Sequence, residues 1–385
     1  MRIGIDARSI LNPEKSAPSG VAHYVYHLIK NLLEIDKENQ YVLFFDFKVR
    51  DRDVKKFTRP NVKIKFFPFS DYKKYLPGAY SEILGMATYT REKLDVLHSA
   101  SPLYRVPASY RRKVITTFYD FAPYRVPELF PKLSSAKIKT LYSFMAKKSD
   151  RIIAVSQSTK NDAKELLNYP EDKIDMVYNG IDKRFFEESV LPSETLKKDY
   201  NIKDKYILFL GTLEPRKNLT RVLEAFSKFK SNSVDKGRRF DYQLVVAGKR
   251  GWLMEEYFQI VEDLGIKDEV IFTGYVGGDD LKPLYSYAEF FVMPSLYEGF
   301  GQTVVEAMAC GAPAIVSKIS SIPEIAGDSV YYVNPYDTEG IAKAMKELAG
   351  DENLRGALSA RGKEQAKKFS WEKCARETLE VYKSI

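Results

Sequence analysis

The chain has 385 residues, more than one hydrophobic core usually organises, so two domains are expected. Apolar residues make up 44% and charged residues 29%, which is typical of an ordinary soluble protein. No stretch approaches the roughly 18 apolar residues of a membrane-spanning helix, and charges interrupt the apolar start where a signal peptide would lie. We therefore expect a cytoplasmic protein, in which Cys310 and Cys374, the two cysteines of the sequence, are free thiols.

The positive charge is concentrated in the first part of the chain. Residues 1–150 contain 27 Lys and Arg against 15 Asp and Glu, a net of +12, whereas the whole chain carries +8. Such a surface fits an anionic partner, either a phospholipid surface or a phosphorylated acceptor, or it is simply solvated. Nucleic acid is not an expected partner, because no recognition motif accompanies the basic residues.

Strands and helices alternate along the first half of the chain. Arg2–Ala7 predicts a short apolar strand, and Val21–Leu33 predicts an amphipathic helix after a loop rich in Pro, Ser and Gly. Further strands are predicted at Tyr41–Asp46, Val62–Phe67, Val96–His98, Val114–Phe118, Ile152–Val155 and Asp175–Val177. Helical stretches separate most of these strands, which indicates βα units and a parallel sheet.

A second series of the same kind follows the charged segment Asp182–Lys198. Its predicted strands are Tyr206–Leu210, Gln243–Ala247, Val270–Thr273, Phe290–Pro294, Ala314–Ser317 and Val330–Val333, with helices at Asn218–Lys230 and Gly301–Cys310. Ser370 is placed to cap a last helix. We therefore expect an α/β protein of two Rossmann-like domains, residues 1–185 and 186–369. The helix at 370–385 is in a position to pack back on the first domain.

One segment, Pro294–Pro313, carries most of the functional information. An apolar strand runs into a turn with Glu298, Gly299 and Gly301, and the following helix contains Glu306. Glycines let the backbone approach a ligand closely, and the free N–H groups of a helix start favour an anion. Carboxylates accept hydrogen bonds from vicinal hydroxyls, which suits a sugar at one end and a ribose at the other. The alternative is a tight turn with two solvated glutamates.

The whole segment resembles the signature of the family-four (GT4) retaining glycosyltransferases. Further segments that resemble this family are Gly211–Leu219, Phe272–Val276, Ser320–Glu324, Phe369–Trp371, Ser156–Thr159 and Tyr178–Asp182. The resemblance implies the GT-B fold, in which two Rossmann-like domains face each other across a cleft. Resemblance to bacterial mannosyltransferases implies transfer of mannose from GDP-mannose to a lipid-linked or saccharide acceptor. UDP-glucose and dTDP-rhamnose are alternative donors.

The resemblance also implies roles for individual residues. Glu298 is expected to bind hydroxyls of the donor sugar, and Glu306 the ribose. Arg216 and Lys217 are expected to hold the diphosphate and to neutralise the leaving group, so that no metal or other cofactor is required. The alternative for this pair is an exposed basic patch, although the helix dipole disfavours cations at a helix start. The remaining donor-binding positions that it implies are Gly20, Thr212, Tyr275, Val276, Gly299, Phe300, Gly301, Gln302 and Thr303.

Two departures from the family pattern affect these expectations. Tyr119-Asp120 stands where relatives usually carry His-Asp, and tyrosine is a poor base near neutral pH. A front-face mechanism, in which the leaving phosphate takes the acceptor proton, requires no histidine. We therefore expect an active enzyme with Tyr119 and Asp120 in its catalytic site, Asp120 orienting the acceptor hydroxyl unless it serves only as a turn or N-cap residue. A catalytically silent relative and a sugar-nucleotide epimerase are the alternatives. Gln302-Thr303 replaces the frequent Leu-Pro, which bears on the identity of the donor sugar.

Other patterns in the first part of the chain bear on metal and membrane binding. Asp51 and Asp53 have a metal-binding spacing but lie in a charge-dense run, and His23 and His27 show no third ligand, so no metal site is predicted. The segment Phe66–Lys93 mixes aromatic and basic residues. It is either a lipid-interface segment, giving peripheral contact with the inner face of the membrane, or a packed helix of the acceptor domain.

Overall fold

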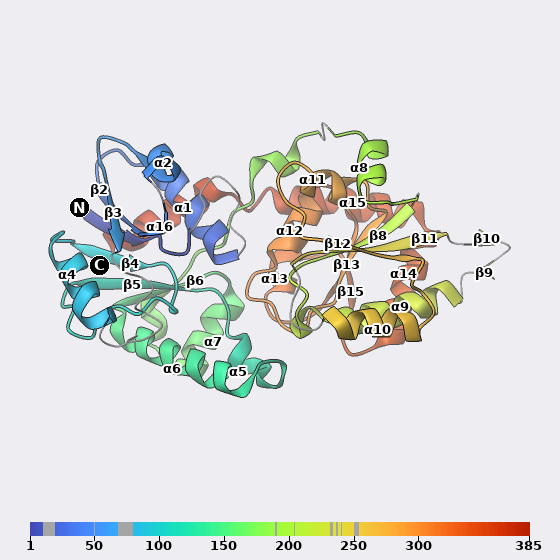
Figure 1. Cartoon of the computed structure of the whole chain (residues 1–385), viewed down its shortest axis with the longest axis horizontal. Helices are drawn as coiled ribbons and strands as arrows, with labels where there is room; N and C mark the ends of the chain where they lie inside the picture. Colours follow the sequence, from blue (N-terminus) through green and yellow to red (C-terminus); the bar gives the residue numbers. More distant parts are fainter. Residues whose placement is uncertain are drawn as a thin grey trace. The chain divides into compact units, whose positions relative to one another are not determined.

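The computed structural model describes residues 1–10, 20–49, 51–67, 80–188, 191–203, 205–231, 234–235, 238–239, 241–249 and 254–385. It divides into two compact units. Unit 1 comprises Met1–Gly180 and Phe369–Ile385, and unit 2 comprises Ile181–Lys368. The chain thus enters unit 2 after Gly180 and returns to unit 1 after Lys368 (Figure 1), whereas we expected the passages after residues 185 and 369.

Unit 1 is built on a parallel sheet. In the described part of the chain it has seven strands in the order β3-β2-β1-β4-β5-β6-β7. The strands are β1 (Arg2–Asp6), β2 (Gln40–Asp46), β3 (Val62–Phe67), β4 (Val96–Ser99), β5 (Lys113–Phe118), β6 (Arg151–Ala154) and β7 (Ile174–Met176). Each strand predicted for this half is present, with its ends within one residue of the prediction.

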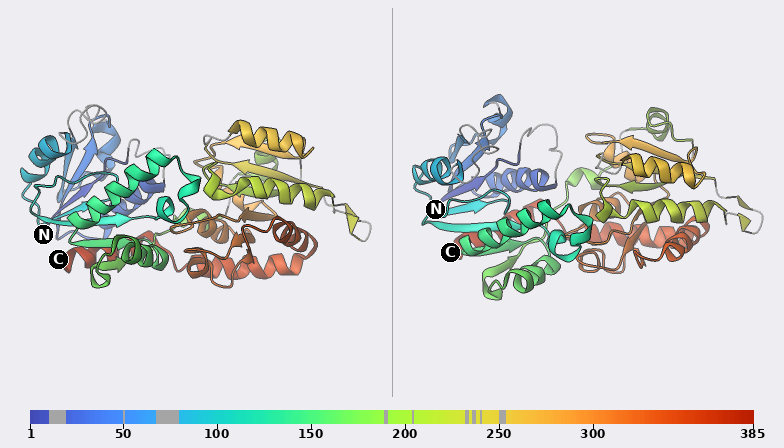
Figure 2. Two further views of the ribbon diagram at one scale, coloured as in Figure 1. Left: turned by 90° about the horizontal axis from the view of Figure 1, so that it is seen from below. Right: turned by 60° about the horizontal axis from the view of Figure 1, so that its bottom comes forward.

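Helices cover both faces of this sheet. They are α1 (Gly20–Ile35), α2 (Asp51–Val54), η1 (Lys55–Phe57), η3 (Tyr80–Gly85), α4 (Met86–Thr90), α5 (Ala122–Arg125), η4 (Pro127–Leu129), α6 (Lys132–Lys148), α7 (Gln157–Leu167), η5 (Glu171–Lys173) and α16 (Trp371–Lys383). Side chains alternate along a strand, so Val114 and Phe118 of β5 join the core cluster that contains Tyr142 of α6. Figure 2 shows α6 and α7, in teal and green, lying side by side.

The opposite face of the same strands contacts the last helix. Both ring nitrogens of His98 in β4 are hydrogen-bonded. Nδ1 lies 2.7 Å from the Tyr382 hydroxyl, and Nε2 lies 2.8 Å from Thr117 Oγ1. Burial lowers the pKa of His98 to about 3, so this imidazole is neutral at physiological pH. The Ser370 side chain accepts from the Lys373 amide and caps α16, as its position in the sequence predicted. The helix α16 thus belongs to unit 1, where it packs on α1.

Unit 2 repeats the plan. In its described residues a six-stranded parallel sheet has the order β12-β11-β8-β13-β14-β15, and a two-stranded hairpin, β9 with β10, lies apart from it. The strands are β8 (Lys205–Leu210), β9 (Val234–Asp235), β10 (Arg238–Arg239), β11 (Tyr242–Ala247), β12 (Val270–Gly274), β13 (Phe290–Met293), β14 (Ala314–Ser317) and β15 (Tyr331–Val333). The strands of the large sheet also begin and end within one residue of the predictions, whereas the hairpin was not predicted.

The helices of unit 2 lie on both sides of its sheet. They are η6 (Lys183–Phe186), α8 (Ser193–Asp199), η7 (Pro215–Lys217), α9 (Leu219–Ser231), α10 (Met254–Asp263), α11 (Leu281–Ser286), α12 (Gln302–Ala309), α13 (Ile322–Ala326), α14 (Thr338–Gly350) and α15 (Glu352–Ala366). In Figure 1, α9, α10 and α14 are on one side of the sheet and α11, α12 and α15 on the other. This two-layer cover explains why the central strands are apolar on both faces.

In both sheets the strand order reverses at one point. Strand β1 lies between β2 and β4, and β8 lies between β11 and β13, with Ile207 of β8 paired to Phe290 of β13. Ligands of doubly wound sheets bind beyond the carboxyl ends of the strands at such a reversal. In unit 2 the loops that leave β8 and β13 therefore start side by side, at the place where a ligand site is expected.

The remaining sequence features are packed rather than clustered for chemistry. The His27 ring stacks on Trp371 with centroids 5.1 Å apart, and His23 lies against His27, so this pair is packed. Cys310 and Cys374 are free thiols, as predicted.

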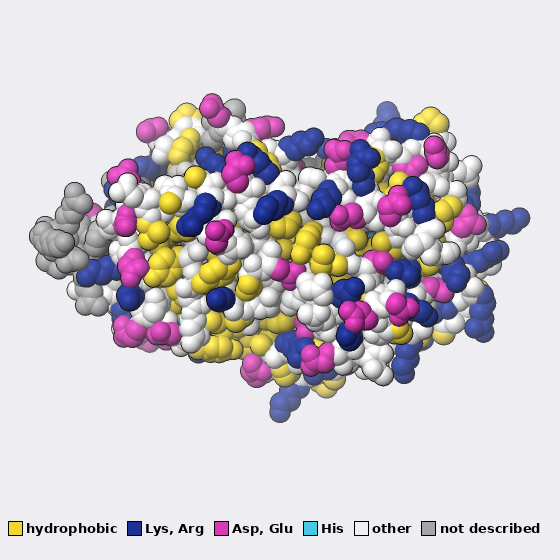
Figure 3. Space-filling model, turned by 180° about the vertical axis from the view of Figure 1, so that it is seen from behind, with side chains coloured by type: hydrophobic (Ala, Val, Ile, Leu, Met, Phe, Trp, Pro, Cys, Tyr) yellow, Lys and Arg dark blue, Asp and Glu magenta, His cyan; other side chains and the backbone are white. Residues whose placement is uncertain are grey.

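None of the helices in the described part of the chain has the length and apolar character that crossing a bilayer requires. Figure 3 shows Lys and Arg side chains interspersed with Asp and Glu over the face that it presents.

Candidate active site

The loop between β13 and α12 is buried along its whole length. It contains Glu298, whose side chain the sequence placed at the sugar, and it ends at Gly301. Gly301 has φ of +92°, and a Cβ there would lie 2.6 Å from Ile322 Cδ1. Only glycine fits this position without displacing its neighbours, because other residues rarely adopt a positive φ. The loop therefore turns sharply into α12.

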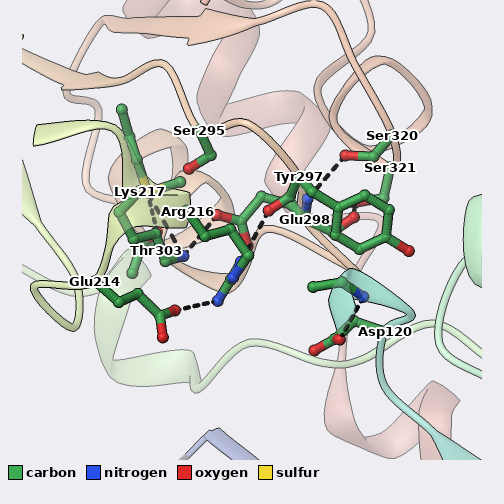
Figure 4. A network of polar contacts seen from close by, with 12 residues as sticks. Asp120, Glu214, Arg216, Lys217, Ser295, Tyr297, Glu298, Thr303, Ser320 and Ser321 are labelled. Carbon is green, nitrogen blue, oxygen red and sulfur yellow. Dashed lines mark hydrogen bonds and ion pairs between the residues drawn. The ribbon is translucent and has the colours of Figure 1, made fainter. Parts of the chain in front are cut away.

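Two cations hold the Glu298 carboxylate. Lys217 Nζ lies 2.6 Å from Oε1, and Arg216 Nη1 lies 3.0 Å from Oε2 (Figure 4). Both cations come from η7 in the loop that leaves β8. Glu298 is 5% exposed, and this burial opposes ionisation, but Lys217 and Arg216 outweigh it and lower the pKa of Glu298 to about 2. The carboxylate is therefore ionised at neutral pH.

The backbone on either side of Glu298 is also held. The Glu298 amide donates to Ser320 Oγ at 2.9 Å, and Ser321 Oγ donates to the Glu298 carbonyl at 3.0 Å (Figure 4). Arg216 Nη1 also donates to the Tyr297 carbonyl at 2.8 Å. Ser320 has φ of +48°, a costly conformation for serine. The loop after β8 thus holds the carboxylate of Glu298, and the loop after β14 holds its backbone.

The cationic pair differs from a surface patch. Lys217 is 8% exposed, so the alternative interpretation of an exposed basic pair is wrong for this residue. Asn218 follows with φ of +65°, and its Nδ2 donates to the Pro294 carbonyl at 2.9 Å. These contacts tie the loop after β8 to the loop after β13. Arg216 Nη2 also donates to Glu214 Oε1 at 2.5 Å, a partner that sequence reasoning did not identify.

The second glutamate of the motif has different surroundings. Glu306 of α12 is buried, and the hydroxyl of the fully buried Tyr285 donates to its Oε2 at 3.1 Å. Burial raises the pKa of Glu306 to about 7, although the Tyr285 hydroxyl and the nearby Arg184 oppose this rise. Tyr285 comes from α11, and nothing in its sequence position indicated this contact. Neither glutamate of the motif is simply solvated, so that alternative is wrong.

The other predicted donor-binding residues of unit 2 lie at strand ends or helix starts. Thr303 Oγ1 donates to Met293 Sδ at 3.2 Å. Buried positions among them are Val276, Gly299 and Phe300, half-buried positions are Gln302 and Thr303, and exposed positions are Thr212 and Tyr275. Gly20 belongs to unit 1, where it is the exposed first residue of α1. The preceding residues 11–19 of the predicted loop lie outside the described part of the chain.

In unit 1 the predicted acceptor residues follow β5. Asp120 Oδ1 accepts from the Ala122 amide at 3.0 Å, which is the turn role that the sequence left open (Figure 4). The Tyr119 hydroxyl donates to the Ala100 carbonyl at 2.5 Å. Burial raises the pKa of Tyr119, so its hydroxyl stays protonated and donates to the backbone beyond β4.

The metal-binding spacings and the aromatic and basic segment are the remaining sequence patterns. Within the described residues, no group of three or more His, Cys, Asp or Glu side chains lies close enough together to hold a metal ion. Of the aromatic and basic segment Phe66–Lys93, residues 68–79 lie outside the described part of the chain, and residues 80–90 form η3 and α4.

Family comparisons match both halves of the chain. The family described as "Glycosyl transferases group 1" matches residues 192–365, and "Glycosyltransferase Family 4" matches residues 18–185. The O-antigen chain mannosyltransferase B of Escherichia coli is 29% identical over 97% of this chain and 98% of its own length. The serotype-specific mannosyltransferase WbdA of Escherichia coli is 31% identical over 74% of this chain, which corresponds to 35% of that longer protein.

Solved structures resemble the whole chain at low sequence identity. Sucrose-phosphate synthase of Thermosynechococcus elongatus has a TM-score of 0.75 at 18% identity, covering 100% of this chain and 98% of that one. Anabaena HepE in complex with UDP and glucose has a TM-score of 0.73 at 17% identity, covering 100% of both chains. With its two parallel α/β sheets, the chain has the GT-B fold that the sequence predicted.

Proposed function

Because residues 192–365 belong to the glycosyl transferases of group 1 and residues 18–185 to glycosyltransferase family 4, we propose that this glycosyltransferase moves mannose from GDP-mannose. Its acceptor in this proposal is a saccharide or a lipid-linked saccharide in polysaccharide assembly. The choice of sugar is supported by the relative named O-antigen chain mannosyltransferase B, which aligns with 97% of this chain. The observation that carries the proposal is the buried, ionised Glu298 between Arg216 and Lys217 at the strand-order reversal of unit 2.

This arrangement suits both halves of a nucleotide sugar. An ionised carboxylate accepts hydrogen bonds from sugar hydroxyls and has more acceptor sites than its two cationic partners occupy. Arg216 and Lys217 attract the diphosphate and stabilise the negative charge that grows on it as the sugar leaves. Glu306, in its ionised form, accepts hydrogen bonds from the ribose. Because two cations supply this charge, the proposal requires no metal ion or other cofactor.

The chemistry is a substitution with retained configuration. The bond between the sugar C1 and the phosphate oxygen breaks, and the acceptor oxygen bonds to C1 from the same face. The acceptor proton passes to the leaving phosphate oxygen, so no protein base is needed. This fits Tyr119, whose raised pKa makes it unable to accept a proton at neutral pH. Asp120 orients the acceptor hydroxyl in this proposal.

A donor panel tests the proposal. GDP-mannose, UDP-glucose and dTDP-rhamnose are compared by thermal shift, because a ligand of the folded state raises the melting temperature. Transfer to a mannosyl acceptor and hydrolysis of the donor are then measured with and without a chelator, using Glu298→Ala as the control. We expect GDP-mannose to give the largest shift and chelator-resistant transfer, and NMR to show retained configuration at C1.

Other results separate the alternatives. Binding without turnover of any nucleotide sugar would indicate a catalytically silent relative. Formation of an epimerised donor in the absence of acceptor would indicate an epimerase. Turnover of UDP-glucose in preference to GDP-mannose would contradict the proposed donor but not the reaction class.

We also propose peripheral contact with an anionic membrane through unit 1. Helix α6 contains five lysines and no acidic residue, and its Leu133 is 88% exposed. Lysines beside an exposed apolar side chain suit the interface of an anionic bilayer. We expect co-sedimentation with vesicles that contain phosphatidylglycerol, weakened by Leu133→Ser and by salt. Equal binding to neutral vesicles would contradict the electrostatic part of this proposal.

A further inference from the structure

Arg216 is engaged by carboxylates from two sides. Its Nη1 lies 3.0 Å from Glu298 Oε2, and its Nη2 lies 2.5 Å from Glu214 Oε1 (Figure 4). In these four side chains, counting Lys217, two cations are balanced by two carboxylates. A diphosphate approaching this cluster therefore meets two negative charges as well as two positive ones. One carboxylate must move away from its cation before both Arg216 and Lys217 can bind the diphosphate.

The two carboxylates are not equally able to leave. Glu298 is buried, its side chain 6% exposed, and it has both Lys217 and Arg216 as partners. The Glu214 side chain is 18% exposed and lies at the outer edge of the cluster in Figure 4. Moving a partly exposed carboxylate into water costs less than uncovering a buried one. Glu214 is therefore the partner that an incoming anion displaces.

The backbone around Glu214 allows its side chain to move alone. The Glu214 amide donates to the Thr212 carbonyl at 2.8 Å, and its carbonyl accepts from the Lys217 amide at 2.9 Å. Pro215 follows and restricts Glu214 to the extended conformation that it has, with φ of −125° and ψ of 153°. Rotation about the side-chain bonds releases Arg216 without disturbing this turn or the position of Lys217.

We propose that Glu214 occupies, in the unliganded protein, the place on the Arg216 guanidinium that the donor diphosphate takes. It keeps the charge of Arg216 balanced until the donor binds, and it sets which anions can bind. A ligand with charge on two phosphate groups displaces it, whereas a single carboxylate or monoester competes poorly. This inference rests on the proposed function, because it assumes a diphosphate at Arg216 and Lys217. The opposite role, in which Glu214 orients Arg216 for the ligand, predicts the opposite change in affinity.

Calorimetric binding of GDP and of inorganic pyrophosphate distinguishes these roles. We compare the unaltered protein with Glu214→Gln, which keeps the shape of the side chain, and with Glu214→Ala. The matched control is Glu262→Gln, since Glu262 lies on the surface of α10 and pairs with Lys267 there. It removes the same charge from unit 2 without touching Arg216. Melting temperatures establish that each variant is folded.

We expect both Glu214 variants to bind GDP and pyrophosphate about three- to tenfold more tightly, because a competing charge-assisted hydrogen bond is removed. The Glu262 variant is expected to bind as the unaltered protein does. A gain in affinity is a result that a merely structural role of Glu214 would not produce. Unchanged or weaker binding by the Glu214 variants, while the unaltered protein binds GDP, overturns the inference alone. No binding of any nucleoside diphosphate by the unaltered protein overturns the proposed function together with it.

Discussion

Glu298 and Glu306 stand at the two ends of one short stretch of unit 2, and both are buried, yet their surroundings act on them in opposite directions. Glu298 lies between Arg216 and Lys217, which lower its pKa to about 2. The Tyr285 hydroxyl donates to Glu306, and among the residues that the structure describes no Lys or Arg lies within hydrogen-bond distance of this carboxyl group. Burial raises the pKa of Glu306 to about 7. The residue type therefore does not decide the charge state at this site; burial and the side chains around each carboxyl group decide it.

The same contrast has consequences for stability that run in opposite directions with pH. The lowered pKa of Glu298 contributes stability above the ordinary value of 4.5, and this contribution is lost as the pH falls towards 2. The raised pKa of Glu306 contributes stability below 4.5, and this contribution is lost as the pH rises towards 7. Ionisation of Glu298 therefore favours the folded state, whereas ionisation of Glu306 disfavours it.

Removing Lys217 should have the largest effect on this contrast. Lys217→Met leaves Glu298 buried with Arg216 as its cation, and breaking a buried pair costs about 3–5 kcal/mol of the unfolding free energy. Urea unfolding at pH 7 measures the loss. In the double variant with Glu298→Gln the loss should be smaller than the sum of the two single losses, because the stranded charge is gone.

A surface pair provides the control for that measurement. Lys228 Nζ lies 2.6 Å from Glu339 Oε1, and both side chains are exposed. Lys228→Met removes the same group from an equally short ion pair but should change stability little, because water screens it. If Lys217→Met and Lys228→Met cost the same, the Glu298 site is not the desolvated ion pair described above.

The second largest effect is expected at Glu306. The Glu306→Gln variant has no carboxyl group at this position, so its free energy of unfolding should rise relative to that of the unaltered protein as the pH increases from 4.5 to 8. A pKa raised from 4.5 to about 7 corresponds to a difference of about 3 kcal/mol over this range. Urea unfolding at several pH values measures it. A difference between the two proteins that does not vary with pH would show that Glu306 titrates as in water.

Much of this picture follows from local sequence. Strands such as Val62–Phe67 and Ala314–Ser317 are predicted to the residue, because alternating or continuous apolar runs depend only on neighbouring positions. Through the family resemblance, the motifs at Gly211–Leu219 and Pro294–Pro313 assigned Lys217 and Glu298 to one donor site, and the structure brings the two side chains within 2.6 Å of each other.

The contacts that the sequence does not indicate depend on which strands and helices are neighbours in the fold. Ser320 and Glu298 are hydrogen-bonded because β14 lies beside β13, and Tyr285 reaches Glu306 because α11 packs on α12. Tyr119 stands in place of a family histidine and was therefore expected in the catalytic site. Its contact is instead with Ala100, at the end of the adjacent strand β4. Such contacts are set by strand order and packing, which no local pattern contains.

The smallest expected effect isolates the Tyr285 hydroxyl. Tyr285→Phe removes the hydrogen bond that favours the ionised form of Glu306, so the pKa of Glu306 should rise further. The loss of stability at pH 8 should exceed that at pH 5 by about 1 kcal/mol, because hydrogen bonds to charged groups are the stronger ones. Tyr206→Phe is the matched control, since this equally buried hydroxyl donates at 2.8 Å to the Leu284 carbonyl, which does not titrate. The control should lose the same stability at both pH values. A pH-dependent loss in both variants would mean that another group titrates here, and the assignment to Glu306 would fail.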